Sequence, residues 1–205
     1  LNEFAYAMVN AVKCQFGQQK LSKLQLVEHS MSLDLQQLGE SYLASTRPRT
    51  GHTPKFIDKL PLNYLYCGLI HAALPNAKII LLERTPMDVC YAIYKTLFTA
   101  PYPFSYDLKE LGTYYLAYRR LIGHWQATLG QSMLTVRYED LVHNQEAQTR
   151  QIIDYCGLSW EEACLEFQNN DAASSTASAV QVRQPIYTSS LGLWRNYQQQ
   201  LQPLV

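Results

Sequence analysis

A short apolar run that leads directly into an arginine and a helix start is the feature that most limits how this chain can fold. Residues 79–82 (Ile-Ile-Leu-Leu) are apolar and partly β-branched, which is typical of a strand buried on both faces. Arg84 closely follows this run, Thr85 offers a hydroxyl for an N-cap, and Pro86 suits the first helical position. The sequence therefore predicts a buried parallel strand that ends at an arginine and is followed at once by a helix.

This junction is a candidate ligand site, because ligands of open α/β sheets bind at the carboxyl ends of the strands. An arginine beside a helix N-terminus is well suited to a phosphate group. Asp88 falls in the first turn of the predicted helix, where a carboxylate complements the helix dipole. The alternative is that Arg84 only ends the strand and pairs with Asp88, and the local pattern leaves both interpretations open.

Further strands and helices alternate on either side of the junction. Residues 55–59 (Lys-Phe-Ile-Asp-Lys) predict a second short strand that ends in charged residues, and Pro61 opens a helix to about Ala73. Residues 107–129 have the apolar spacing of one long helix, and residues 133–136 form another apolar run. The alternation predicts an α/β fold with a parallel sheet flanked by helices.

Length and composition predict one ordered domain over residues 1–205. The chain is 47% hydrophobic and 17% charged, which suffices for a core and is unlike a disordered chain. Lysine plus arginine and aspartate plus glutamate number 17 each, which argues against a general nucleic-acid or anionic-membrane binder. The first predicted helix spans residues 4–16, with Gly17 as its stop, and residues 47–54 predict a loop.

The cysteines indicate a reducing compartment. The chain has five, which is an odd number, and no two of them have the spacing of metal ligands. We therefore expect free thiols, no metal site and a cytoplasmic location. The sequence also has no signal peptide, no apolar run near the ~20 residues of a membrane span, and no Gly-x-Ser-x-Gly hydrolase motif.

The segment Arg84-Thr85-Pro86-Met87-Asp88 resembles the 3′-phosphate-binding strand-turn-helix of sulfotransferases that use 3′-phosphoadenylyl sulfate (PAPS). Among these enzymes the chain is most similar to the bacterial branch associated with tetratricopeptide repeats, which is akin to the tyrosylprotein sulfotransferases. The resemblance implies a P-loop-type fold in which Arg84 binds the 3′-phosphate. Family members place a serine eight residues later on the same phosphate, but Ala92 stands there in this chain and supplies no hydroxyl donor.

The resemblance also assigns Lys59 and Tyr138. The family has a lysine near the sulfuryl group, before a helix like the one that Pro61 opens, and Lys59 matches it. A cation there would stabilise the charge on the bridging oxygen. The alternative is an exposed lysine beside Asp58. Tyr138 and Glu139 match a tyrosine-glutamate pair of the family, in which the tyrosine contacts the nucleotide. The alternative is that Tyr138 covers the sheet and Glu139 pairs with Arg137.

Near the end of the chain, the family has a loop that closes over the 3′-phosphate and the adenine. The resemblance assigns Arg183, Ser190 and Arg195 to this loop, in falling order of preference. Family members also carry a glycine-rich loop for the 5′-phosphosulfate and a glutamate general base, and neither has a counterpart in these 205 residues. The resemblance puts both before Leu1, so we expect the chain to be the later part of the domain and inactive by itself.

The predicted function is therefore transfer of a sulfuryl group from PAPS to a hydroxyl or amine acceptor, with release of adenosine 3′,5′-bisphosphate (PAP). The acceptor is a small molecule, peptide or saccharide, and the branch implies an upstream repeat domain in the full-length protein. We expect no nucleic-acid partner and no membrane span. Two alternatives remain: a binding-only remnant of the nucleotide site, and a nucleotide kinase of related architecture.

Overall fold

The computed structural model describes residues 3–17, 20–98, 102–170 and 183–204. Contacts divide the chain into two compact units. The first unit comprises Leu1–Ile79 and Trp125–Ser132, and the second comprises Ile80–His124 and Met133–Val205. The sequence-based expectation of one domain remains a prediction.

The first unit is helical. Its elements are α1 (Glu3–Phe16), α2 (Lys23–Ser30), α3 (Leu35–Thr50), the 3₁₀ helix η1 (Pro61–Tyr66) and α4 (Cys67–Ala73). Helix α1 packs against α2 and α3, and α3 packs against α4. The core between them is built from one stripe of α1 and facing residues of the other helices: Phe4, Met8, Val12, Leu33, Leu38, Tyr42 and Ala73. The apolar spacing of residues 4–16 thus predicted α1 correctly, and Gly17 ends it at a φ of 98°.

The structure corrects two predictions in this unit. Residues 55–59 form no strand, and Ile57 is 93% exposed. A strand needs a hydrogen-bonded neighbour, and the segment pairs with none of the described strands. Residues 47–50 belong to α3 rather than to a loop, since the Arg47 guanidinium holds the helix end by donating to the carbonyls of Gly51 and Thr53.

Helices α3 and α4 approach most closely at Gly39. A Cβ atom added to Gly39 would overlap the backbone carbonyl of Ala73, which cannot move without moving α4. Gly39→Ala is therefore expected to lower the free energy of unfolding by about 1–3 kcal/mol.

Gly123, in α6, is the matched control, because a Cβ atom there meets nothing within 4 Å. Gly123→Ala is expected to raise the free energy of unfolding by about 0.5–1 kcal/mol. Urea denaturation of both variants measures the two effects. Equal stability losses would contradict the close approach at Gly39.

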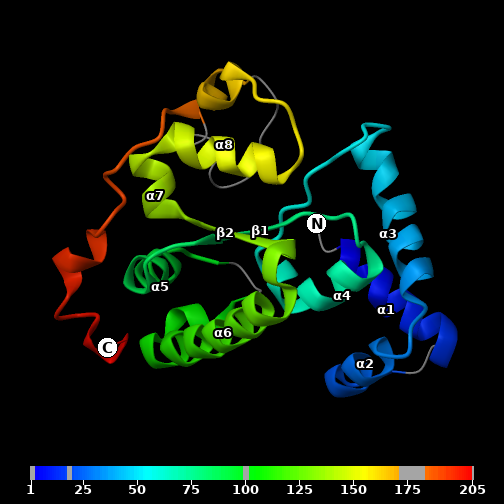
Figure 1. Cartoon of the computed structure of the whole chain (residues 1–205). Helices are drawn as coiled ribbons and strands as arrows, with labels where there is room; N and C mark the ends of the chain where they lie inside the picture. The colour runs from blue at the N-terminus through cyan, green and yellow to red at the C-terminus, as the bar shows by residue number, and fades with distance from the viewer. Residues whose placement is uncertain (1–2, 18–19, 99–101, 171–182, 205) are drawn as a thin grey trace. The chain divides into compact units, whose positions relative to one another are not determined.

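The second unit holds the sheet. Strands β1 (Ile79–Glu83) and β2 (Met133–Arg137) pair in parallel. In Figure 1, α7 (Tyr138–His143) and α8 (Gln145–Tyr155) lie on one side of the strand pair, and α5 (Pro86–Tyr94) and α6 (Leu108–Leu129) lie on the other. The described residues also form short 3₁₀ helices: η3 (Gly130–Ser132) in the first unit, and η2 (Pro103–Tyr106), η4 (Glu162–Leu165), η5 (Phe167–Asn169), η7 (Leu193–Tyr197) and η8 (Gln202–Leu204) in the second. The α/β fold class is confirmed, although the structure is mostly helical.

Strand β1 is not buried on both faces, as its apolar run predicted. Ile80 is 41% exposed and Leu82 is 57% exposed, while Ile79, Leu81 and Glu83 are half-buried. In the described part of the chain, β1 pairs with β2 alone, so no second neighbouring strand helps to cover it. The prediction of a strand at this place was correct, and the prediction of its burial was wrong.

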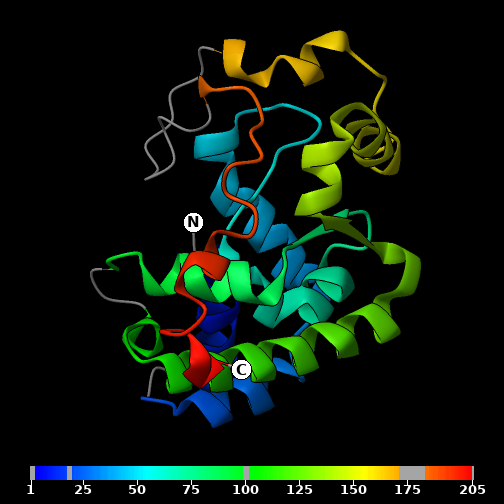
Figure 2. The same cartoon turned by 90° about the vertical axis from the view of Figure 1, so that its left-hand side faces the viewer.

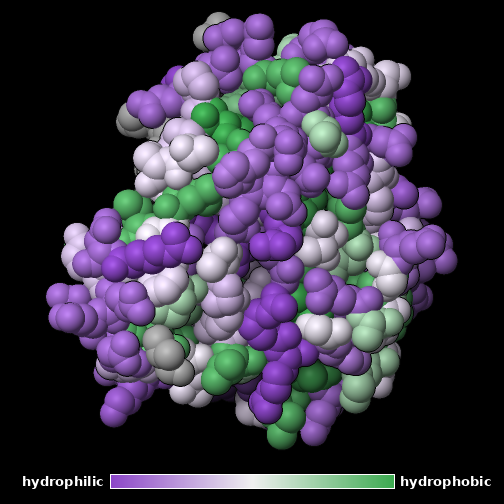
Figure 3. Space-filling model, turned by 60° about the vertical axis from the view of Figure 1, so that its left-hand side comes forward, coloured by the Kyte–Doolittle hydropathy of each residue, from purple (hydrophilic) through white to green (hydrophobic). Residues whose placement is uncertain are grey.

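The last part of the second unit returns to helix α5. Figure 2 shows this segment running across α5, and η7 packs against that helix. The rings of Tyr91 on α5 and Tyr197 on η7 are stacked, with centroids 5.2 Å apart. Seen from the side of this segment, the surface is mostly hydrophilic, with separate hydrophobic patches (Figure 3). The C-terminal segment is therefore positioned beside the β1–α5 junction.

Candidate functional site

The β1–α5 junction has the predicted strand-turn-helix form. Strand β1 ends at Glu83, and α5 begins with Pro86 at its first position. The Thr85 side chain, however, does not cap α5 as predicted. Instead the Thr85 hydroxyl and the Thr85 backbone N–H both donate to Oε1 of Glu139, each at 2.7 Å. A carboxylate accepts stronger hydrogen bonds than a neutral group, which explains why Thr85 turns toward Glu139.

Arg84 is half-buried and is held by two other residues of the second unit. Its Nη2 donates to the carbonyl oxygen of Ser190 at 2.5 Å. Its guanidinium carbon lies 5.0 Å from the centre of the Tyr138 ring, in a cation–π arrangement. The Nε atom of Arg84 is buried, and no described residue accepts its hydrogen bond. A guanidinium has five N–H donors, so Arg84 keeps capacity for an anionic ligand.

Ser190 and Tyr138 complete a group of three predicted residues. The Tyr138 hydroxyl lies 3.4 Å from the Ser190 hydroxyl oxygen, and either atom can be the donor. The two residues are 52 positions apart in the sequence. The structure thus joins Arg84, Tyr138 and Ser190, which were proposed separately for one nucleotide.

Arg183 and Arg195 are less well defined as site residues. Both are exposed. The backbone N–H of Arg195 donates to the carbonyl of Gly192 at 3.0 Å, and its guanidinium carbon lies 5.8 Å from the ring centre of Trp194. Arg195 is therefore next to the turn that contains Ser190, while Arg183 is the first described residue after the gap at 171–182.

Lys59 is in the first unit, unlike the other predicted site residues. Its side chain is exposed, and the residue before it is anchored: the Tyr42 hydroxyl donates to Oδ2 of Asp58 at 2.8 Å. The role of Lys59 in sulfuryl transfer remains a prediction.

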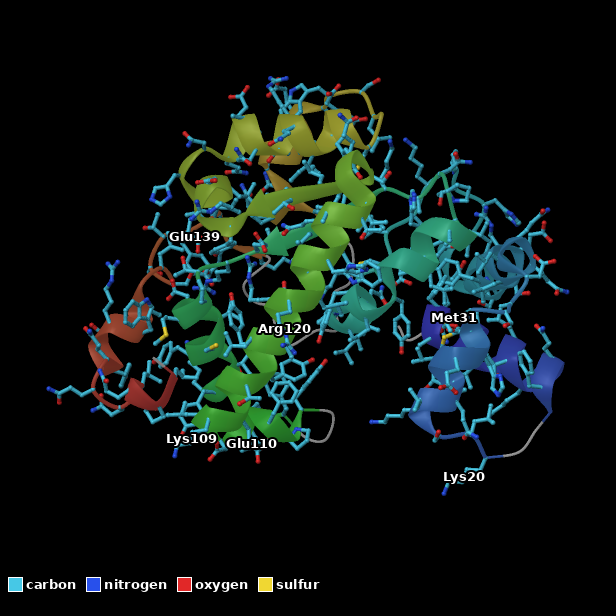
Figure 4. All side chains as sticks on the ribbon, turned by 60° about the horizontal axis from the view of Figure 1, so that its bottom comes forward. Lys20, Met31, Lys109, Glu110, Arg120 and Glu139 are labelled. Carbon is cyan, nitrogen blue, oxygen red and sulfur yellow. The ribbon has the colours of Figure 1, made fainter. Side chains whose placement is uncertain are left out.

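Sequence reasoning missed the long-range contacts of two residues that organise this site, Asp88 and Glu139. Asp88 is only 3% exposed, and its Oδ2 accepts a hydrogen bond from the backbone N–H of Gly192 at 3.0 Å. The sequence suggested ion pairs of Asp88 with Arg84 and of Glu139 with Arg137. Neither ion pair is present in the described residues. Figure 4 shows Glu139 at the start of α7. The Tyr-Glu pair was a usable signal for Glu139, but nothing local indicated the partner of Asp88.

The environment of Glu139 favours its ionised form. Burial raises the pKa of the Glu139 carboxyl, but the hydrogen bonds from Thr85 and the nearby Arg137 lower it more, so the net pKa lies below its ordinary value of 4.5. Because the folded-state pKa is lowered, the ionised carboxylate stabilises the fold above about pH 4.5. This contribution is lost as the pH falls further, through the lowered folded-state pKa.

Glu139→Gln keeps an oxygen acceptor for Thr85 but removes the charge. We expect the variant to be about 1 kcal/mol less stable than the wild type near neutral pH, because hydrogen bonds to charged groups are stronger. We also expect a shallower loss of unfolding free energy than the wild type between about pH 6 and pH 3. Urea denaturation across this range measures both effects. Parallel stability curves for the two proteins would contradict the lowered pKa of Glu139.

The described ranges lack two further classes of feature. No group of three or more His, Cys, Asp or Glu side chains is placed there to hold a metal ion. No helix in this part of the chain has the length and apolar character needed to cross a membrane.

The β1–α5 junction lies within the part of the chain that matches a known family. Residues 5–162 match the sequence profile of the Sulfotransferase family. A protein of Aquifex aeolicus (strain VF5), described as uncharacterized, is 33% identical over 174 residues. This match covers 83% of the present chain but 23% of the relative, so the chain spans about a quarter of that protein's length.

Proposed function

Because the chain belongs to the sulfotransferase family, we propose that it transfers a sulfuryl group from PAPS to a hydroxyl or amine acceptor. The observation that carries the proposal is the arrangement of Arg84. A half-buried arginine stands between a strand end and a helix start, keeps one buried N–H donor without an acceptor in the described residues, and contacts Tyr138 and Ser190. This is a suitable receptor for the 3′-phosphate that distinguishes PAPS from common nucleotides.

The proposed roles follow from the chemistry of each side chain. Arg84 binds the 3′-phosphate by charge-assisted hydrogen bonds, and the hydroxyls of Tyr138 and Ser190 orient the nucleotide. Arg183 and Arg195 add positive charge from the C-terminal segment. Lys59 stabilises the bridging oxygen as PAP leaves.

The reaction is an in-line attack by the acceptor, and catalysis consists mainly of positioning and electrostatic stabilisation. A P-loop-type loop for the 5′-phosphosulfate and a general base complete the proposed site, and neither is assigned to a residue of this chain. The cytoplasmic location, the acceptor class and a neighbouring repeat domain are parts of the same proposal.

Calorimetry with PAP, AMP and ATP tests the nucleotide assignment. We expect PAP to bind at least about tenfold more tightly than AMP, which lacks the 3′-phosphate, because that phosphate makes the charge-assisted bonds. ATP binding stronger than PAP binding would favour the nucleotide kinase instead. Sulfate transfer from radiolabelled PAPS to a panel of hydroxyl and amine acceptors separates an enzyme from a binding-only protein.

A further inference from the structure

A turn near the C-terminus is held in place by two residues of the β1–α5 junction, Arg84 and Asp88. We call residues 190–192 the 190–192 turn. Its first residue accepts a hydrogen bond from Arg84, and its last residue, Gly192, donates its backbone N–H to Oδ2 of Asp88 at 3.0 Å. Gly192 has a φ of 70°, in the left-handed region that favours glycine. The turn therefore presents Ser190 to Arg84 while Asp88 holds its other end.

The Asp88 side chain is unusual for a carboxylate at a helix start. It is 3% exposed, and its second oxygen, Oδ1, is buried without a partner in the described part of the chain. Burying a carboxylate is costly unless hydrogen bonds or favourable dipoles compensate for the lost water. The N-terminus of α5 supplies a favourable dipole, but an exposed side chain would receive that benefit at less cost. The hydrogen bond from the Gly192 N–H compensates part of this cost.

A second contact between this segment and α5 is a ring stack. Tyr91 stacks on Tyr197 three residues further along α5 than Asp88, at 5.2 Å between ring centres. Residues three apart on a helix lie on neighbouring positions of one face. Asp88 and Tyr91 thus attach the C-terminal segment at two adjacent points, and Asp88 is the attachment nearer to Arg84.

We propose that Asp88 is a positioning residue, which fixes the 190–192 turn so that Ser190 stands against Arg84 and Tyr138 in the geometry that receives an anion. Asp88 acts through the Gly192 N–H and does not itself contact the ligand. The proposal rests on the proposed role of Arg84 in binding the 3′-phosphate. Without the carboxylate, the turn loses the hydrogen bond at its Gly192 end, and Ser190 is held less firmly beside Arg84.

The test compares Asp88→Ala and Asp88→Asn with Glu146→Ala as the matched control. Glu146 is also an acidic residue in the first turn of a helix, but it is exposed and pairs with Arg150 instead. Hydrogen exchange reports the Gly192 N–H, calorimetry reports PAP affinity, and thermal unfolding reports overall stability. For Asp88→Ala we expect the Gly192 amide to exchange at least about tenfold faster and PAP to bind about tenfold more weakly. The control should match the wild type in both measurements.

Asp88→Asn keeps an oxygen acceptor in nearly the same shape, so partial rescue of both values is expected. It is also the deciding variant if Asp88→Ala does not fold. Faster Gly192 exchange with unchanged PAP affinity would show that the contact is only structural and would overturn the proposal. Unchanged exchange would overturn it as well. If the wild type does not bind PAP, the proposed nucleotide role of Arg84 fails and this inference fails with it, while Gly192 exchange still decides whether Asp88 holds the turn.

Discussion

Replacing Arg84 with alanine is expected to weaken PAP binding about 10- to 150-fold, which corresponds to the roughly 1.5–3 kcal/mol of a charge-assisted hydrogen bond. The buried Nε of Arg84 has no acceptor among the described residues, and Nη2 donates a hydrogen bond to the Ser190 carbonyl. A phosphate would satisfy the buried donor and add charge attraction. The binding loss should therefore exceed the effect on folding, which is limited to the Ser190 contact and the stacking on Tyr138.

Arg120→Ala is the matched control for Arg84→Ala. Arg120 is an exposed arginine on α6, in the same unit, and Figure 4 shows it apart from Glu139. Its removal changes the net charge equally but should leave PAP affinity within about twofold of the wild type. Arg84→Lys keeps the charge but loses the planar fork, so intermediate affinity is expected. If Arg84→Ala and Arg120→Ala bind PAP equally well, Arg84 is only a structural residue.

The elements that could be predicted from the sequence are those with strong local signals. Helices α1 and α6 have long apolar stripes, and both lie within a residue of the predicted limits. The β1–α5 junction was predicted because a strand run, an arginine and a proline follow one another within a few residues. The predictions that failed depended on neighbouring strands. Among the described residues, residues 55–59 have no partner strand, and β1 has no second neighbouring strand to cover Ile80 and Leu82.

In the candidate site, too, local features could be predicted and long-range contacts could not. Arg84 was predicted from its local position, and Tyr138 and Ser190 were predicted from the family resemblance. The hydrogen bond from Gly192 to Asp88 could not be predicted, because 104 residues separate the partners and an aspartate in a first helical turn is already explained by the helix dipole. The partner considered for Glu139 was the neighbouring Arg137, yet Glu139 binds Thr85, 54 positions away. Local patterns locate such carboxylates but do not identify their partners.

The prediction with the largest expected effect concerns Lys59. If this lysine stabilises the leaving bridging oxygen, Lys59→Ala should lower kcat for sulfate transfer about 10²- to 10³-fold, as for other groups that stabilise transition-state charge. PAP affinity should change far less, because the charge on the bridging oxygen develops during the reaction. Arg84→Ala should show the opposite pattern, with a larger effect on nucleotide affinity than on kcat.

The backbone before Lys59 is anchored, and a second exposed lysine on the same segment provides a control. Burial and the hydrogen bond to Asp58 raise the pKa of Tyr42 above its ordinary value, so Tyr42 remains a donor and holds Asp58 at neutral pH. The backbone is thus tied to the core of the first unit immediately before the exposed Lys59. Lys55→Ala is the matched control, since Lys55 is exposed on the same segment and has no proposed role. Both variants are assayed with radiolabelled PAPS, in the shortest form of the protein that transfers sulfate. Equal kcat values for the two variants would remove Lys59 from the mechanism and leave the bridging oxygen to another cation.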